Sequence, residues 1–162
     1  MVRKELAGLL LSEVERFFPR ATTELKNWEN DFQFLVCIIL SAQTTDKQVN
    51  KITKELFKKY PVAKKLSMAK LEDLEYTLGG INYYRTKSKH IKEMAKILDS
   101  KFSGQPPKSI EKLVKLPGVG YKTANVFLND RYKANQGIAV DTHVLRVARA
   151  YGLTKNTNPT RV

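Results

Sequence analysis

The chain has 162 residues, 42% of them hydrophobic, which is enough for one core or for two small helical lobes. Lysine and arginine number 29 against 16 aspartate and glutamate, and the formal net charge of +13 favours a polyanionic partner such as DNA, RNA or an anionic lipid surface. The one cysteine, Cys37, excludes a disulfide framework and a cysteine-only metal site within this chain.

Apolar residues recur at helical spacing along almost the whole chain, which predicts an all-α fold. The first helix carries an apolar stripe and ends at Pro19. Charged residues at positions 13, 15 and 16 interrupt its apolar run, so we expect neither a membrane span nor a secretory signal, and an intracellular protein of the cytoplasm or nucleoid. The stripe consists of Leu6, Leu9, Leu10, Val14, Phe17 and Phe18.

The segment 32–40 is apolar on nearly all sides and predicts the central helix, with Cys37 as a small buried hydrophobe. The next helix is capped by Thr44 or Thr45 and ends before Pro61. A helix over roughly 68–78 stops at two glycines, and an amphipathic helix through residues 91–98 follows.

The stretch "LPGVGYKTA", residues 116–124, interrupts an otherwise helical pattern. It predicts a short helix from Ser109 to about residue 115, a turn, and a second helix to about residue 129. Gly118 and Gly120 place backbone N–H groups without side chains near a helix N-terminus, which is typical of phosphate binding without base recognition. An ordinary helix–helix turn would favour the same residue types.

Lys122 follows the turn directly, in the first turn of the second helix. Desolvation and the positive helix dipole both disfavour the ammonium form, so this amine is a candidate nucleophile; a phosphate contact is the simpler alternative. Asp141, in "AVDTHVLRV", begins the last helix, which stops at Gly152. Its simplest role is an N-cap, and its alternative role is stabilisation of an oxocarbenium-like sugar.

Three segments together resemble the endonuclease III branch of the helix-hairpin-helix (HhH-GPD) DNA glycosylases: "ILSAQTTDKQVNK", "LPGVGYKTANVFLN" and "AVDTHVLRVARAYGL". The resemblance spans nearly the whole chain. It implies a two-lobed all-α protein that flips a damaged pyrimidine out of duplex DNA into a cleft. It also implies three segments, namely an N-terminal helix of the second lobe over 1–25, a six-helix lobe over 26–135 with its hairpin at 109–129, and an incomplete second lobe over 136–162.

The resemblance implies that Lys122 attacks C1′ of the sugar and nicks the strand by β-elimination, with assistance from Asp141. The expected enzyme is a bifunctional glycosylase and abasic-site lyase for oxidised pyrimidines, with duplex DNA as partner and no membrane or obligate protein partner. Two alternatives stay open. One is a DNA-binding module without catalysis, and the other is a monofunctional mismatch glycosylase that needs no lysine nucleophile.

The resemblance further implies that Gln43 fills the gap left by the flipped nucleotide and that Tyr83, or alternatively Ile81, wedges between bases. Asn82 lies where the family often has glycine, and asparagine tolerates positive φ. The other expected DNA contacts are Arg85, Lys87, Pro117, Gly118, Val119, Gly120, Thr123 and His143.

No side-chain metal ligands are expected, but the resemblance implies that a monovalent cation, Na⁺ or K⁺, binds the backbone carbonyls of Val114, Leu116 and Val119. Family members carry four further cysteines that ligate a 4Fe-4S cluster. With Cys37 alone we expect no such cofactor, and interpret the chain as a fragment or as a reduced homologue. The stripe of the first helix is then expected to be an exposed patch that favours self-association.

Overall fold

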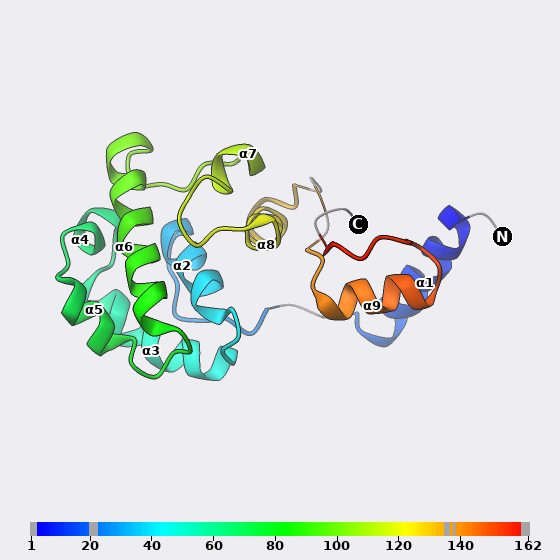
Figure 1. The fold of residues 1–162 in the computed structure, drawn as a ribbon, viewed down its shortest axis with the longest axis horizontal. Coiled ribbons are helices and arrows are strands. Elements are labelled where there is room, and N and C mark those ends of the chain that lie inside the picture. Colours follow the sequence, from blue (N-terminus) through cyan, green and yellow to red (C-terminus); the bar gives the residue numbers. More distant parts are fainter. Residues whose placement is uncertain (1–2, 20–22, 135–136, 138, 160–162) are drawn as a thin grey trace. The chain divides into compact units, whose positions relative to one another are not determined.

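The computed structural model describes residues 3–19, 23–134, 137 and 139–159, and the chain divides into two units. One unit is formed by residues 24–139, and the other by residues 1–23 together with 140–162. The described part of the chain contains helices and no strand, which confirms the all-α class (Figure 1).

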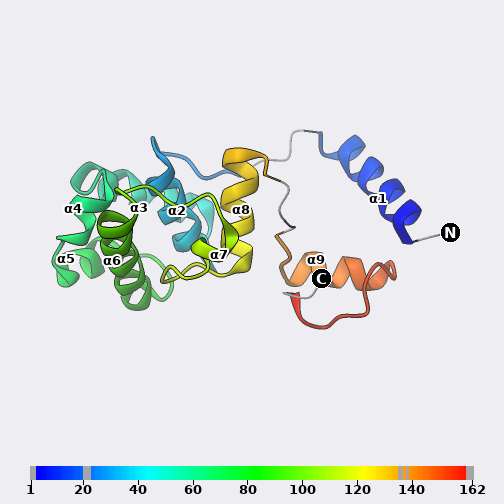
Figure 2. The ribbon, with the colours of Figure 1, turned by 90° about the horizontal axis from the view of Figure 1, so that it is seen from above.

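The 24–139 unit is built around one buried helix, α2. Every residue of α2 from Phe32 to Leu40 is buried, which confirms the central helix expected from its apolar sequence. Helix α2 packs against α3, α6 and α8, and α6 packs in turn against α4 and α5 (Figures 1 and 2). The helices of this unit are α2 (Asp31–Ser41), α3 (Asp46–Lys59), α4 (Ala63–Ser67), α5 (Leu71–Thr77), α6 (Tyr84–Lys101), α7 (Ile110–Leu113) and α8 (Tyr121–Tyr132).

The helix expected over roughly 68–78 is present as α5, but it begins later, at Leu71, and Met68 lies outside it and is 76% exposed. The short helix α4, which precedes it, was not expected. Helix α4 spans five residues, less than two turns, so it shows too little of the apolar repeat by which a helix is recognised. The cap of α3 was predicted correctly, because the Thr45 hydroxyl accepts a hydrogen bond from the backbone N–H of Gln48.

Cys37 lies in the middle of α2 and is fully buried, as expected for a small hydrophobe. Burial raises the pKa of its thiol to about 12. The reactive thiolate form is therefore strongly disfavoured at neutral pH.

The second unit contains α1 (Arg3–Phe17) and α9 (Thr142–Ala150). Leu9, Val14 and Phe17 of α1 are each more than half exposed, which confirms an exposed apolar stripe on this helix; self-association stays a prediction. Helix α9 stops before Gly152, whose φ of +68° is the left-handed conformation that glycine supplies at helix ends. Of the helices in the described ranges, none combines the length and apolar character needed to cross a bilayer.

Candidate nucleic-acid interface

The segment between α7 and α8 is a compact turn anchored in the core of the 24–139 unit. Leu116 and Val119 are buried, and the N–H of Val119 donates to the carbonyl of Leu116 at 3.1 Å. Gly118 has φ of +80°, and a Cβ at this position would lie 3.1 Å from Cβ of His90 and 3.2 Å from Cγ2 of Ile39. The turn therefore requires glycine at 118, both for its backbone conformation and for its close approach to α2 and α6.

Gly120 is the N-cap of α8 and has the opposite environment. Its φ is −93°, and a Cβ there would have no heavy atom within 4 Å. The first N–H groups of any α-helix lack an intrahelical acceptor and carry the positive end of the helix dipole. Because residue 120 has no side chain and open space around it, a phosphate can approach the start of α8 closely.

Lys122 lies in the first turn of α8 and is exposed. Thr123 beside it and Pro117 in the turn are half-buried. The predicted nucleophile thus follows the phosphate-accessible helix start directly, on a helix that packs against both α2 and α7.

Gln43 occupies a tight turn that follows α2 directly. The N–H of Thr44 donates to the carbonyl of Ser41 at 3.0 Å, Ala42 has φ −56° and ψ 114°, and Gln43 has φ +56°. These values define a type II β-turn with Gln43 at the position that normally favours glycine or asparagine. The side chain of Gln43 is exposed.

A second loop, between α5 and α6, lies beside this turn, because the amide of Asn82 donates to the carbonyl of Gln43. Tyr83 is the N-cap of α6, with φ of +58° and 67% exposure. The left-handed residue is therefore Tyr83 and not Asn82, a correction to the sequence interpretation. Ile81 is only 2% exposed, so its side chain belongs to the core and does not fit a wedge; Tyr83 is the wedge candidate that remains.

Between the two loops lies an open recess of about 480 Å³. Two of its lining residues are in close contact, since Gln48 donates from Nε2 to the carbonyl of Gly80 at 3.2 Å, and a Cβ at Gly80 would meet that nitrogen at 2.4 Å. Of the lining residues, only Gln43 was expected from the sequence to contact DNA. The contacts of Gln48 depend on how the second loop folds, which local sequence does not reveal. The lining residues are Gln43, Thr44, Thr45, Gln48, Gly80 and Asn82.

The hairpin turn and the two loops converge on the same part of the unit. Gly118 lies against Ile39 near the C-terminal end of α2, and the Gln43 turn continues from that end. Tyr83 is the N-cap of α6, and His90 further along α6 contacts Gly118. The packing of α2 against α6 therefore brings together segments that are far apart in the sequence.

Lys87 was expected to contact DNA directly, and the structure does not support this role. Its side chain is buried in α6, and its ammonium lies 2.8 Å from the carbonyl oxygen of Leu40, 2.6 Å from that of Ala42 and 3.3 Å from the hydroxyl of Thr44. Desolvation by burial lowers its pKa. Arg85 is exposed, with its guanidinium 5.6 Å from the ring centroid of Tyr84, and its contact with DNA stays a prediction.

Asp141 and His143 belong to the other unit, at the start of α9. The carboxylate of Asp141 accepts hydrogen bonds from the N–H groups of His143 at 2.9 Å and Val144 at 2.8 Å, so the N-cap role is confirmed. Both hydrogen bonds go to the same carboxylate oxygen, Oδ1, which is thereby held at the N-terminus of α9. The catalytic role of Asp141 and the DNA contact of His143 stay predictions.

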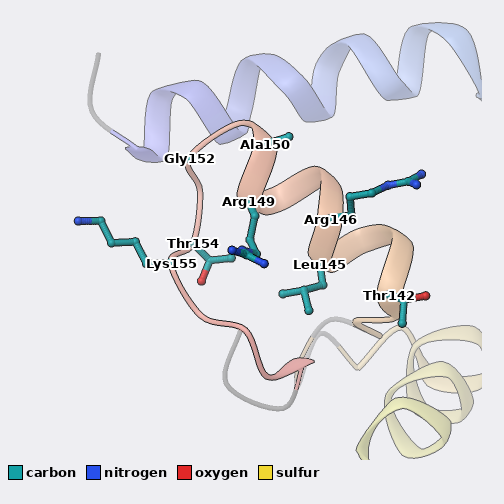
Figure 3. A pocket seen from close by; sticks show the side chains of 8 residues that line it. All are labelled: Thr142, Leu145, Arg146, Arg149, Ala150, Gly152, Thr154 and Lys155. Carbon is teal, nitrogen blue, oxygen red and sulfur yellow. The ribbon is translucent and has the colours of Figure 1, made fainter.

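A larger recess of about 720 Å³ lies between α9 and the segment that follows it, and sequence analysis did not anticipate it. Figure 3 shows Leu145 and Arg149 directed into this space, facing Thr154. Its cationic residues are exposed, and no buried polar side chain in it points to a ligand, so we assign it none. Its lining consists of Thr142, Leu145, Arg146, Arg149, Ala150, Gly152, Thr154 and Lys155.

The family's iron–sulfur cluster does not fit this chain, because four thiolates are required and the sequence holds one cysteine, buried inside α2. Among the residues that the structure describes, no three His, Cys, Asp or Glu side chains gather into a metal-binding group. For the expected monovalent cation, the carbonyl of Leu116 already accepts one hydrogen bond, and a carbonyl oxygen retains a second lone pair.

These features define a class, an all-helical protein with a glycine-dependent helix-hairpin-helix motif. Residues 36–162 match the family model of the HhH-GPD superfamily base excision DNA repair protein, and the chain therefore belongs to this family.

The similar proteins are endonuclease III homologues. The chain is 38% identical to endonuclease III of Synechocystis sp. over 99% of its own length and 73% of that protein. It is 40% identical to the Bacillus subtilis enzyme over 90% of its length and 65% of that protein. It thus spans about two thirds of the length of such relatives.

The fold is also similar to that of solved endonuclease III structures. A non-covalent endonuclease III–DNA complex superposes with a TM-score of 0.82 at 40% identity, covering 91% of this chain and 68% of that one. A trapped covalent endonuclease III–DNA intermediate gives a TM-score of 0.83 with the same identity and coverage. A thermostable thymine-DNA glycosylase, at 19% identity and a TM-score of 0.81, shares the fold.

Proposed function

We propose that this chain is a base-excision-repair DNA glycosylase with abasic-site lyase activity, acting on oxidised pyrimidines in duplex DNA through Lys122. The observation that carries the proposal is the position of Lys122, exposed in the first turn of α8 next to a helix start that is open to phosphate. A lysine nucleophile needs its target sugar held at a fixed distance. A phosphate bound at residues 118–120 would hold the neighbouring sugar close to this amine.

The reaction follows from the chemistry of an amine. The nitrogen of Lys122 attacks C1′, and the bond between C1′ and the base breaks, with its electron pair leaving on the base, which takes up a proton. The nitrogen loses one proton, the bond between C1′ and the ring oxygen breaks, and the ring oxygen takes up the second proton of the nitrogen, which gives an open-chain imine. Removal of a C2′ proton then expels the 3′ phosphate and nicks the strand, and water hydrolyses the imine to restore the lysine.

Support for DNA as the partner comes from three directions: the net charge of +13, the open helix N-terminus, and likeness to endonuclease III solved in complex with DNA. Within the recess at the two loops, the Gln43 amide would pair with the base left unpaired by flipping. Tyr83 would stack into the opened step. Asp141 would stabilise positive charge on the sugar.

We further propose that the backbone carbonyls of Val114, Leu116 and Val119 hold Na⁺ or K⁺ in the hairpin. A cation there would place positive charge beside the bound phosphate.

Borohydride trapping tests the proposed function directly. The full chain is incubated in the presence of borohydride with a duplex that carries an abasic site and, separately, with a thymine-glycol duplex. Borohydride reduces the imine to an amine, which leaves a stable covalent adduct between protein and DNA. We expect an adduct with the wild-type chain and none with Lys122→Ala. Lys112→Ala removes the same charge from an exposed position of α7, in the same hairpin, and should trap normally.

The possible results separate the three functions. Binding without any adduct, at every enzyme concentration, would favour a DNA-binding module. Base release that persists in Lys122→Ala would favour a monofunctional glycosylase.

A further inference from the structure

The Gln43 turn has a conformation that its own sequence does not favour. In a type I turn the residue at the position of Gln43 has negative φ, which suits glutamine, whereas type II requires positive φ. Left-handed backbone is unfavourable for a residue with a Cβ. Something outside "SAQT" must therefore select type II.

Lys87 is the group in position to make this selection. The two turn types differ chiefly in the orientation of the central peptide, whose carbonyl here belongs to Ala42, with ψ of Ala42 changing by roughly 150°. The ammonium of Lys87 lies 2.6 Å from this carbonyl oxygen. In a type I turn that oxygen would point away, and the buried ammonium would lose its shortest contact.

The remaining contacts of the ammonium fix its place. Its other partners are the carbonyl of Leu40, at the end of α2, and the hydroxyl of Thr44, on the far side of Gln43. An ammonium has three donors, and these three oxygens match them. Lys87 thus bridges the end of α2 and both residues that flank Gln43. Its stem, which extends from α6, is buried.

We propose that Lys87 is a positioning residue, which holds the carbonyl of Ala42 and thereby keeps Gln43 in the left-handed conformation from which its side chain reaches the recess. Asn82 supports the same turn from the other loop through the carbonyl of Gln43. The consequence for DNA rests on the proposed function, but the conformational claim does not.

The conformational claim is tested without DNA. In Lys87→Met, which keeps an apolar stem and loses the ammonium, backbone coupling constants should show that Gln43 has moved to negative φ or averages between the two turns. Lys89→Met removes an equal charge from an exposed position of α6 and should leave Gln43 at positive φ. A folded Lys87→Met with Gln43 still at positive φ would overturn the proposal.

If Lys87→Met does not fold, the wild-type chain decides the question by nitrogen NMR. The ammonium protons of Lys87 should exchange slowly and couple through hydrogen bonds to the carbonyl carbons of Leu40 and Ala42. Rapid exchange like that of exposed lysines, with no such coupling, would exclude the contact.

A double-mutant cycle tests the route from Lys87 to DNA, with a duplex containing a tetrahydrofuran abasic-site analogue. If the type II turn falls to about a tenth of the population, affinity falls about tenfold. In a Gln43→Ala background, Lys87→Met should cause no further loss; equal losses in both backgrounds would show that Lys87 does not act through Gln43. If Gln43→Ala itself has no effect, the proposed role of Gln43 fails, and the coupling constants still decide its placement.

Discussion

The guanidinium of Arg131, in the last turn of α8, lies 2.6 Å from one carboxylate oxygen of Asp31 through both Nε and Nη2. The hydroxyl of Tyr132 donates to the other oxygen, and the guanidinium also lies 4.9 Å from the ring centroid of Trp28. Asp31 is in the first turn of α2, so this cluster joins the last turn of α8, the helix that carries Lys122, to the central helix.

Replacing Asp31 with alanine should lower the free energy of unfolding by about 1–2 kcal/mol, because it breaks a charge-assisted contact and a hydrogen bond to a partly exposed carboxylate. Urea denaturation measures the change. Asp130→Ala removes an exposed carboxylate from α8, next to Arg131, and is the control. An equal effect from both variants would show that the cluster contributes nothing specific.

Tyr132 predicts a dependence of stability on alkaline pH. Burial, with a further contribution from Asp31, raises the pKa of Tyr132 to about 12, against an ordinary value near 10. Because the folded-state pKa is the higher one, the contribution of this phenol to stability is fully present below about pH 10 and is lost as pH rises towards about 12. The stability difference between wild type and Tyr132→Phe should therefore shrink over this range in urea denaturation. A constant difference would contradict the raised pKa.

Tyr83 should show a conflict between stability and function. Tyr83→Gly removes a left-handed tyrosine and should raise the free energy of unfolding by about 1 kcal/mol. The same variant should weaken binding to a duplex with an abasic-site analogue, because it removes the side chain proposed to wedge between the bases. Tyr76→Gly, at an exposed position inside α5, should lower stability by about 1 kcal/mol and leave binding unchanged. Urea denaturation measures the two changes in stability, and titration with the duplex measures binding. A Tyr83→Gly variant that is less stable than wild type, or that binds equally well, would contradict the prediction.

The two hairpin glycines should respond differently to alanine. Gly118→Ala should be destabilising by about 1–2 kcal/mol, since φ is positive and its Cβ would press on His90 and Ile39. Gly120→Ala should change stability by less than about 1 kcal/mol, because a Cβ there meets open space. It should nonetheless weaken DNA binding by obstructing a phosphate. Unchanged affinity in a folded Gly120→Ala would place the phosphate elsewhere.

Local sequence was sufficient wherever one segment determined its own conformation. The hairpin followed from Pro117 and its two glycines, the cap of α3 from Thr45, and the central helix from an uninterrupted apolar run. The family and its fold followed from a few such segments. Helix α4 was missed because it is too short to display a period.

What the sequence did not reveal depends on contacts between distant segments. Lys87 has the pattern of a surface lysine, and its burial arises only when α6 packs beside the end of α2. The left-handed conformation of Tyr83 and the joining of Asp31 to Arg131 have the same origin. Tertiary packing overrode local preference at these positions.

The enclosure of Cys37 gives this chain an intrinsic probe of global unfolding. Alkylating reagents and peroxides react with thiolate, which is reached only when α2 separates from its neighbours. The rate of labelling of the native thiol then reports the opening equilibrium of the whole helical unit, with no engineered label. The same enclosure protects the thiol from oxidation in the native state.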